Sequence, residues 1–319
     1  MTVKEKFFQR IEYSGKLDSI SSIIVKEFGL GDFLANKLVT VGYEDFNYIL
    51  EVARSKYFVK IFSTQRTDND CRRCVEVLLK AIDAGIAVPK LMRSPQGYFH
   101  KTKIGNTKIR LCVMEYIEGK DFFSIKQYPN VAEIKFLAYQ SALISQIKVR
   151  PKFVYDEWAV PNFLKEFKKK SQYLTQRDFE ILKPLVEEFM AMEIVRLPHC
   201  FIHGDILTTN VIKDKEGKIW IIDFSVANYY PRIQEIAVLA CDLIFDEKNK
   251  TNNEHNLALV LEEYQKKIKL TKKEILALPV YIKLAHAMHV LLANYEKKIK
   301  KNDSKENAYF LRRGRMGLR

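Results

Sequence analysis

The sequence lacks several features that would place it outside the ordinary globular proteins. Its five cysteines are odd in number and scattered, so no disulfide framework is expected. No stretch approaches the roughly 18 uninterrupted apolar residues of a membrane span. The first residues mix acidic and basic side chains and lead into no apolar segment, so we expect no signal peptide and a cytoplasmic location. Internal repeats and low-complexity tracts are absent as well.

Metal-binding and acidic residues are also in short supply. Cys71 and Cys74 have a C-x-x-C spacing, but no second pair completes a zinc site, and no metal or redox use is expected of them. Only 39 acidic residues oppose 53 basic ones, which gives a net charge of +14. We favour lysines on solvated faces as the explanation. The alternatives are attraction to nucleotide phosphates and, for the basic residues gathered in 297–319, contact with nucleic acid, although no recognisable nucleic-acid-binding fold accompanies them.

The character of the chain changes near residue 120. Before it, alternating Val, Ile, Tyr and Phe predict strands, and two amphipathic stretches predict helices. After it, helical periodicity dominates, and the only strand candidates lie near residues 211–222. We therefore predict an α+β, two-lobed fold, with a small antiparallel-sheet lobe over 1–117, a hinge near 115–120 and a mainly helical lobe over 118–319. The strands are expected at 37–41, 47–52, 57–62, 98–100, 109–114, 211–213 and 219–222, and the helices at 17–28, 70–84, 131–147, 161–174, 177–196, 232–245, 256–267 and 272–299.

The most informative stretch runs from His203 through Asp205 to Asn210, with Asp223 thirteen residues further on. It has the H-x-D-x-x-x-x-N spacing of kinase catalytic loops, with Gly204 in place of the usual Arg. In phosphoryl transfer a carboxylate takes the proton of the acceptor, which predicts Asp205 as the base. Asn210 and Asp223 offer the oxygen ligands that Mg²⁺ prefers. Taken alone, Asp205 and Asn210 could also be turn residues.

Lys60 lies in a predicted strand with apolar neighbours on both sides, where a buried charge needs a partner. Glu76 follows on the next predicted helix. A strand lysine paired with a helix glutamate is the arrangement with which kinases hold phosphates, so we predict that Lys60 and Glu76 bind ATP. The alternative is a lysine on the exposed face of an edge strand.

Two further segments are placed by position. Gly42 lies between two predicted strands, where it would form either a loop over the triphosphate or a simple hairpin turn. Glu115 and Ile117 lie at the predicted junction of the lobes, where backbone groups would pair with adenine.

Three histidines accompany these groups. For His203 we favour a structural role over a catalytic one, because Asp205 already accepts the proton. His286 and His289 share one face of a predicted helix, and we interpret them as packing or substrate-pocket residues, without a metal.

With these residues in view, the chain resembles the aminoglycoside phosphotransferase and choline kinase-like family, which includes homoserine kinase and methylthioribose kinase. The resemblance spans about 36–245. It implies a protein-kinase-like fold, ATP and Mg²⁺, and a small hydroxyl compound bound by the helical lobe. Two departures are visible: Glu235 replaces an Asp of many members, and Asp45 replaces an Asn. The residues that carry the resemblance are 203–205, Asn210, 222–224, Lys60 with Glu76, and 113–119.

The predicted function is therefore a small-molecule kinase, and the loop beginning at Gly42 favours an amino-alcohol or amino-acid-like acceptor such as homoserine or choline. An aminoglycoside-type antibiotic phosphotransferase is an alternative, since polycationic acceptors need an acidic pocket. A non-catalytic kinase-like binding module is another. Neither Asp-Phe-Gly nor Ala-Pro-Glu occurs, which disfavours a protein kinase. We expect no membrane partner and no nucleic-acid partner. The acidic-pocket candidates are Asp242, Asp246, Glu247 and Glu254.

Overall fold

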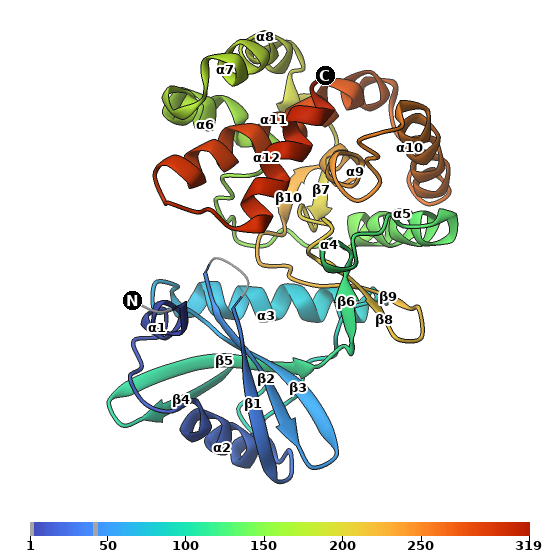
Figure 1. Ribbon diagram of the computed structural model, residues 1–319. Helices are drawn as coiled ribbons and strands as arrows, with labels where there is room; N and C mark the ends of the chain where they lie inside the picture. Colours follow the sequence, from blue (N-terminus) through green and yellow to red (C-terminus); the bar gives the residue numbers. More distant parts are fainter. Residues whose placement is uncertain (1–2, 41–43) are drawn as a thin grey trace. The chain divides into compact units, whose positions relative to one another are not determined.

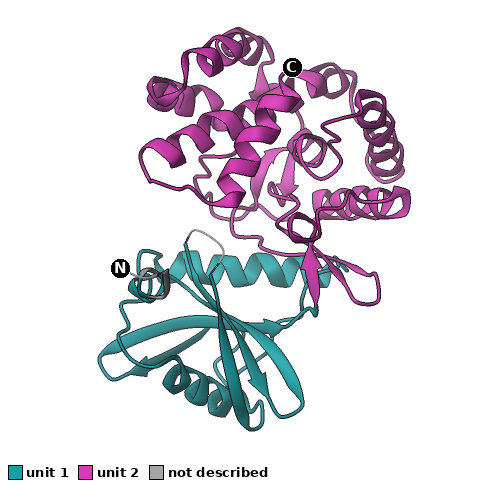
Figure 2. Ribbon diagram, viewed as in Figure 1, with its two compact units in different colours: residues 1–118 teal, residues 119–319 magenta. Residues whose placement is uncertain are grey.

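The computed structural model describes residues 3–40 and 44–319. The chain divides into two compact units, residues 1–118 and 119–319 (Figure 2). The boundary predicted from the sequence differs by one residue.

The first unit is built on a five-stranded antiparallel sheet in the order β1-β2-β3-β5-β4 (Figure 1). Its two longer helices cover opposite faces, and alternation along each strand decides which residues meet which helix. Val59 and Ile61 belong to the core that includes α2, whereas Lys60 between them faces the other way, toward α3. The elements are α1 Val3–Gln9, α2 Leu17–Phe28, β1 Phe33–Val39, β2 Phe46–Val52, β3 Ser55–Ile61, α3 Asp68–Asp83, β4 His100–Ile104 and β5 Thr107–Glu115.

Local sequence explains where the helices of this unit begin and end. Helix α2 stops at Gly29, whose φ of 64° is the left-handed conformation that glycine tolerates best. Helix α3 starts with a capping box, in which Thr67 and Asp70 satisfy each other's backbone N–H groups.

The second unit is mainly helical and carries two small sheets, of order β6-β8-β9 and β10-β7. Helix α11 is its centre and packs against α6, α8, α9 and α12. The elements are β6 Gly119–Asp121, α4 Phe122–Ile125, α5 Val131–Gln146, α6 Phe163–Lys170, α7 Gln176–Leu182, α8 Pro184–Ala191, β7 His199–Ile202, β8 Val211–Asp214, β9 Ile219–Ile221, β10 Asn228–Pro231, α9 Ile233–Cys241, α10 Lys250–Gln265, α11 Lys272–Lys298 and α12 Lys305–Gly317.

Helix α11 is long and apolar enough to cross a membrane by length and composition, the one such helix found among the described residues. Two thirds of its apolar window (67%) is buried inside the unit. That burial is typical of a core helix in a folded domain, which passes the same length and composition test.

Three sequence predictions need correction in this unit. Pro184 divides the helix expected over 177–196 into α7 and α8, because proline starts a helix well and continues one poorly. The helix expected over 161–174 is regular only as α6, between two short 3₁₀ turns. Helix α12 was not expected, because its basic sequence hides the apolar face that packs on α11.

Candidate active site

The loop that follows β7 brings two of the predicted residues together. Asn210 donates from Nδ2 to the Asp205 carboxylate at 2.6 Å and to the Asp205 carbonyl at 2.9 Å. The backbone N–H of Asn210 donates to Leu207 O, which closes the turn. The loop therefore fixes the orientation of the predicted base relative to the predicted metal ligand.

His203 joins this loop to the strand that carries the third predicted residue. Its Nδ1 accepts a hydrogen bond of 3.2 Å from the Asp205 N–H, and its Nε2 lies 3.0 Å from Ile222 O. This pattern requires a neutral ring with the proton on Nε2. Burial lowers the pKa of His203 to about 4, which keeps the ring neutral at physiological pH. His203 thus positions backbone, and Asp205 is left as the proton acceptor of the loop.

Asp223 directly follows β9 and Ile222, whose N–H donates to Asn210 O at 3.0 Å. Its φ is 64°, in the left-handed region that residues other than glycine seldom adopt. Strained backbone of this kind clusters at functional sites, where surrounding contacts hold it. The conformation marks Asp223 as a functional residue independently of its sequence motif.

Carboxylates converge on Asp205. The packing around its carboxyl, followed by the negative charges of Asp156 and Asp223, raises the pKa of Asp205 well above its usual range. Glu306 adds a smaller effect of the same sign. A group of like charges in a partly desolvated place is unfavourable without a cation.

This concentration of charge fits a divalent metal. Among the described residues, no three His, Cys, Asp or Glu side chains form a ready-made metal cage. A metal bound here would use oxygens of Asp223 and Asn210 and take its other ligands from phosphate and water, as Mg²⁺ commonly does.

Helix α9 supports the backbone of the loop at two points. Glu235 accepts hydrogen bonds from the N–H groups of His203, at 3.2 Å, and Gly204, at 2.8 Å. Asp242, seven positions later and therefore on the same helix face, accepts from Thr208 N–H at 2.7 Å. The Glu that replaces the family's usual Asp thus reaches the loop. Gly204, with φ of 81°, has the conformation that the usual Arg would adopt only with strain.

The acidic pocket expected from Asp242 and Glu247 is not where the sequence placed it. Asp242 is fully buried and bound by Tyr309, at 2.8 Å, and by Arg313 of α12. Glu247 pairs with Arg312 at 2.6 Å. These carboxylates anchor α12, because a buried charge is retained only with partners.

His286 and His289 are buried in α11, and burial lowers the pKa of both, to about 3 and about 4. His289 packs against Trp158 and Phe310. The Nδ1 atoms of both rings have no hydrogen-bond partner within the described structure. Their environment is that of packing residues beside aromatic rings.

In the first unit, Lys60 forms an ion pair with Asp45, with 3.5 Å between Nζ and Oδ2. Glu76 is exposed on α3, so its predicted pairing with Lys60 stays a prediction. Gly42 lies outside the described residues. Glu115 ends β5 and donates from its N–H to Lys90 O at 2.8 Å, and Ile117 is buried; their contact with adenine also stays a prediction.

Sequence reasoning missed three residues near the predicted groups. Asp156 and Glu306 act on Asp205 electrostatically, and Arg66 contacts Asp45 at 2.9 Å. Asp156 comes from a loop, and Glu306 from the unexpected helix α12, so no periodicity indicated them. The acidic Asp156 between Tyr155 and Trp158 was the one local signal available.

The comparisons with known proteins agree with this geometry. The model of the phosphotransferase enzyme family matches residues 36–263, well over half of the chain. Homoserine kinase of Zymomonas mobilis subsp. mobilis is 22% identical over 279 residues, which cover 86% of this chain and 85% of that protein.

Two solved structures show the same fold. Amicoumacin kinase hAmiN, in complex with AMP-PNP, Ca²⁺ and Ami, superposes with a TM-score of 0.67 at 17% identity and covers 93% of this chain and 92% of its own. A microcompartment-associated aminopropanol kinase gives 0.67 at 14% identity, covering 93% and 95%. The fold is protein-kinase-like, as the sequence predicted. The chain therefore belongs to the phosphotransferase enzyme family and is an ATP-dependent phosphotransferase that acts on a hydroxyl group.

Proposed function

We propose that this enzyme transfers the γ-phosphate of ATP to the hydroxyl of a small acceptor that carries an ammonium group, an amino alcohol or amino-acid-like compound such as homoserine or choline. The observation that carries the proposal is the negative charge beside the predicted base. Asp156 and Glu306 both act on the Asp205 carboxyl, in a chain whose net charge is +14. Such a local reversal of charge favours a cationic acceptor.

In this proposal Asp205 accepts the hydroxyl proton as the acceptor oxygen attacks the γ-phosphorus. The new P–O bond forms while the bond from the γ-phosphorus to the β–γ bridging oxygen breaks, and ADP leaves with that electron pair. The proton ends on the Asp205 carboxylate. Asn210 and Asp223 would hold Mg²⁺, which supplies positive charge to the phosphate oxygens.

The first unit would bind the nucleotide in the manner that the family resemblance implies. Lys60 would contact the phosphates as a point charge. The backbone of Glu115 and Ile117 would pair with adenine, and the loop at Gly42 would cover the triphosphate.

Asp156 and Glu306 would remain for the acceptor once a metal compensates Asp223. Asp156 is 8% exposed, and its Oδ1 accepts a hydrogen bond of 2.9 Å from Trp158 N–H, which fixes the carboxylate. Burial, and secondarily Asp121, raises the pKa of Glu306. An ammonium group would stabilise both ionised forms, since an opposite charge favours the charged state.

The test is a coupled ADP-release screen with Mg²⁺ and ATP over homoserine, choline, aminopropanol, methylthioribose-like sugars and aminoglycosides. We expect the best substrate to be a small amine. The substitution Asp156→Asn should raise KM for that amine about 10-fold, the effect of about 1.4 kcal/mol, and leave KM for a neutral isostere unchanged. Glu254→Gln, an exposed carboxylate, is the matched control. A neutral sugar as best substrate, with Asp156→Asn without effect, would contradict the acceptor class.

An aminoglycoside-type antibiotic phosphotransferase is the second candidate. It is favoured by the structural similarity to amicoumacin kinase, and the same carboxylates would suit a polycation. Preferred turnover of the antibiotics in the screen would select it.

A binding module and a nucleic-acid-binding protein would behave differently from a kinase in these assays. A non-catalytic binding module would release no ADP with any acceptor. A nucleic-acid partner is disfavoured because Arg312, Arg313 and Arg315 form ion pairs with carboxylates of their own unit.

A further inference from the structure

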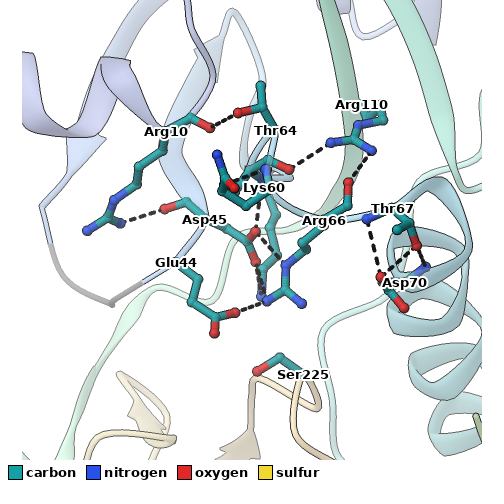
Figure 3. Close-up of polar contacts among 12 residues, drawn as sticks. Arg10, Glu44, Asp45, Lys60, Thr64, Arg66, Thr67, Asp70, Arg110 and Ser225 are labelled. Carbon is teal, nitrogen blue, oxygen red and sulfur yellow. Dashed lines mark hydrogen bonds and ion pairs between the residues drawn. The ribbon is translucent and has the colours of Figure 1, made fainter. Parts of the chain in front are cut away.

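The Asp45 side chain lies at the centre of a group of donors in the first unit (Figure 3). It is 5% exposed. Its Oδ1 accepts hydrogen bonds from Ser63 N–H at 3.1 Å and from Arg66 Nε at 2.9 Å. Its Oδ2 lies 3.3 Å from Arg66 Nη2 and 3.5 Å from Lys60 Nζ. The Asp45 carbonyl also accepts from Arg10 at 2.8 Å. Few carboxylates are held at so many points.

Helix α3 presents a different kind of side chain to Lys60. The thiol of Cys74 lies near the Lys60 ammonium, because that charge lowers the pKa of Cys74 against the larger, opposite effect of burial. Across the sheet, Lys60 is in register with Cys112 of β5. Glu76 is two residues beyond Cys74, about 200° further around the helix, and is exposed. The lysine is therefore flanked by thiols, and a carboxylate must come from elsewhere.

Lys60 needs such a partner. Its side chain is 14% exposed and that of Asp45 3% exposed. An ammonium group in so little contact with water is costly unless a carboxylate compensates it. A lysine has three donors, and one carboxylate oxygen at 3.5 Å uses at most one of them.

Arg66 fixes the position of Asp45. Its guanidinium contacts both carboxylate oxygens of Asp45, the two-pronged geometry in which arginine is most specific, and it also pairs with Glu44. Arg66 is placed by its position one residue before the capping residue of α3. The clamp thus connects the start of α3, the carboxylate before β2 and the lysine of β3.

We infer that Asp45 is the carboxylate that orients Lys60 toward ATP, the role that sequence pattern assigns to Glu76, and that Arg66 is the positioning residue that holds Asp45. The inference rests on the proposed role of Lys60 in nucleotide binding. Because Asp45 directly precedes β2, the anchor of the lysine belongs to the loop expected to cover the triphosphate. The conformation of that loop and the orientation of the lysine are then linked.

The experiment uses the full chain with ATP, Mg²⁺ and the best acceptor of the screen. Steady-state kinetics and AMP-PNP affinity are measured for Lys60→Met, Asp45→Asn, Asp45→Glu, Arg66→Gln and Glu76→Gln, and thermal unfolding checks each fold. We expect Asp45→Asn to lower kcat/KM for ATP on the order of 10- to 100-fold, the usual effect of losing a group that orients a ligand. Asp45→Glu should restore part of it, and Glu76→Gln should stay within about twofold.

The double variant Asp45→Asn with Lys60→Met should be no slower than Lys60→Met alone, because Asp45 acts through the lysine. Arg66→Gln, which keeps both Asp45 and Lys60, should give an intermediate loss and serves if Asp45→Asn does not fold. Wild-type kinetics for Asp45→Asn and Arg66→Gln, with a large loss for Glu76→Gln, would overturn the inference and leave the proposed function intact. Wild-type kinetics for Lys60→Met would overturn the role of Lys60 in the proposed function and the inference with it.

Discussion

Glu235 and Gly204 are joined by a hydrogen bond of 2.8 Å, in which the glycine N–H donates to the glutamate carboxyl. Burial raises the pKa of Glu235 to about 7, although this bond and the one from His203 N–H lower it. The group that supports the catalytic loop is therefore one that titrates near neutral pH.

Stability should consequently depend on pH through Glu235. A carboxyl whose pKa is higher in the folded than in the unfolded protein stabilises the fold below its ordinary pKa of 4.5. That contribution is lost as pH rises through about 7. The penalty of Glu235→Gln should thus be larger at pH 5 than at pH 8, by roughly 3 kcal/mol for a shift of this size. Urea unfolding of both proteins at the two pH values measures it. Glu254→Gln should show no such difference, and an equal Glu235→Gln penalty at both pH values would contradict the assignment.

Asp205→Asn should remove the proton acceptor and keep the loop. An Asn carbonyl oxygen can still accept the hydrogen bond from Asn210, so the fold and nucleotide affinity should change little. We expect kcat to fall by on the order of 10² to 10⁴. Turnover and AMP-PNP binding are measured side by side. Wild-type turnover would disprove the base assignment.

The acid limb of the pH–rate profile should move when Asp156 is neutralised. Asp205 must be ionised to accept a proton, and its raised pKa places the loss of kcat/KM at a higher pH than an ordinary carboxyl would. Asp156→Asn removes a like charge, lowers the pKa of Asp205 and should shift the limb to lower pH. The profile is recorded with a neutral acceptor, so that amine binding does not interfere. An unmoved limb would show that Asp156 does not act on the base.

Arg313 offers a direct comparison with its neighbour Arg312. The Arg313 side chain is 2% exposed and pairs with Asp242, whereas that of Arg312 is 60% exposed and pairs with Glu247. Arg313→Met should cost about 3–5 kcal/mol of unfolding free energy, because it leaves Asp242 buried without its cation. Arg312→Met should cost about 0–1 kcal/mol. Denaturant unfolding of both variants tests the contrast, and equal costs would argue against Asp242 as the anchor of α12.

The sequence was sufficient where local chemistry decides the outcome. Helix α2 has the predicted bounds because its apolar spacing and Gly29 act within one segment. The proximity of Asp205 and Asn210 was likewise predictable, since both lie on one short loop.

The rest of the site depends on packing between distant segments, which sequence spacing does not indicate. Asp156 and Glu306 reach Asp205 from a loop and from α12. The Asp45–Lys60 contact was hidden because the motif supplied another carboxylate, Glu76, at a plausible distance along the chain.

The left-handed backbone of Asp223 has a consequence for how this enzyme would evolve or be engineered. Glycine adopts that conformation without the roughly 1–2 kcal/mol that an L-residue with a side chain gives up. Selection for heat resistance alone would therefore favour Asp223→Gly, and it would yield a sturdier protein that no longer phosphorylates anything. Only the demand for turnover keeps the aspartate at this position.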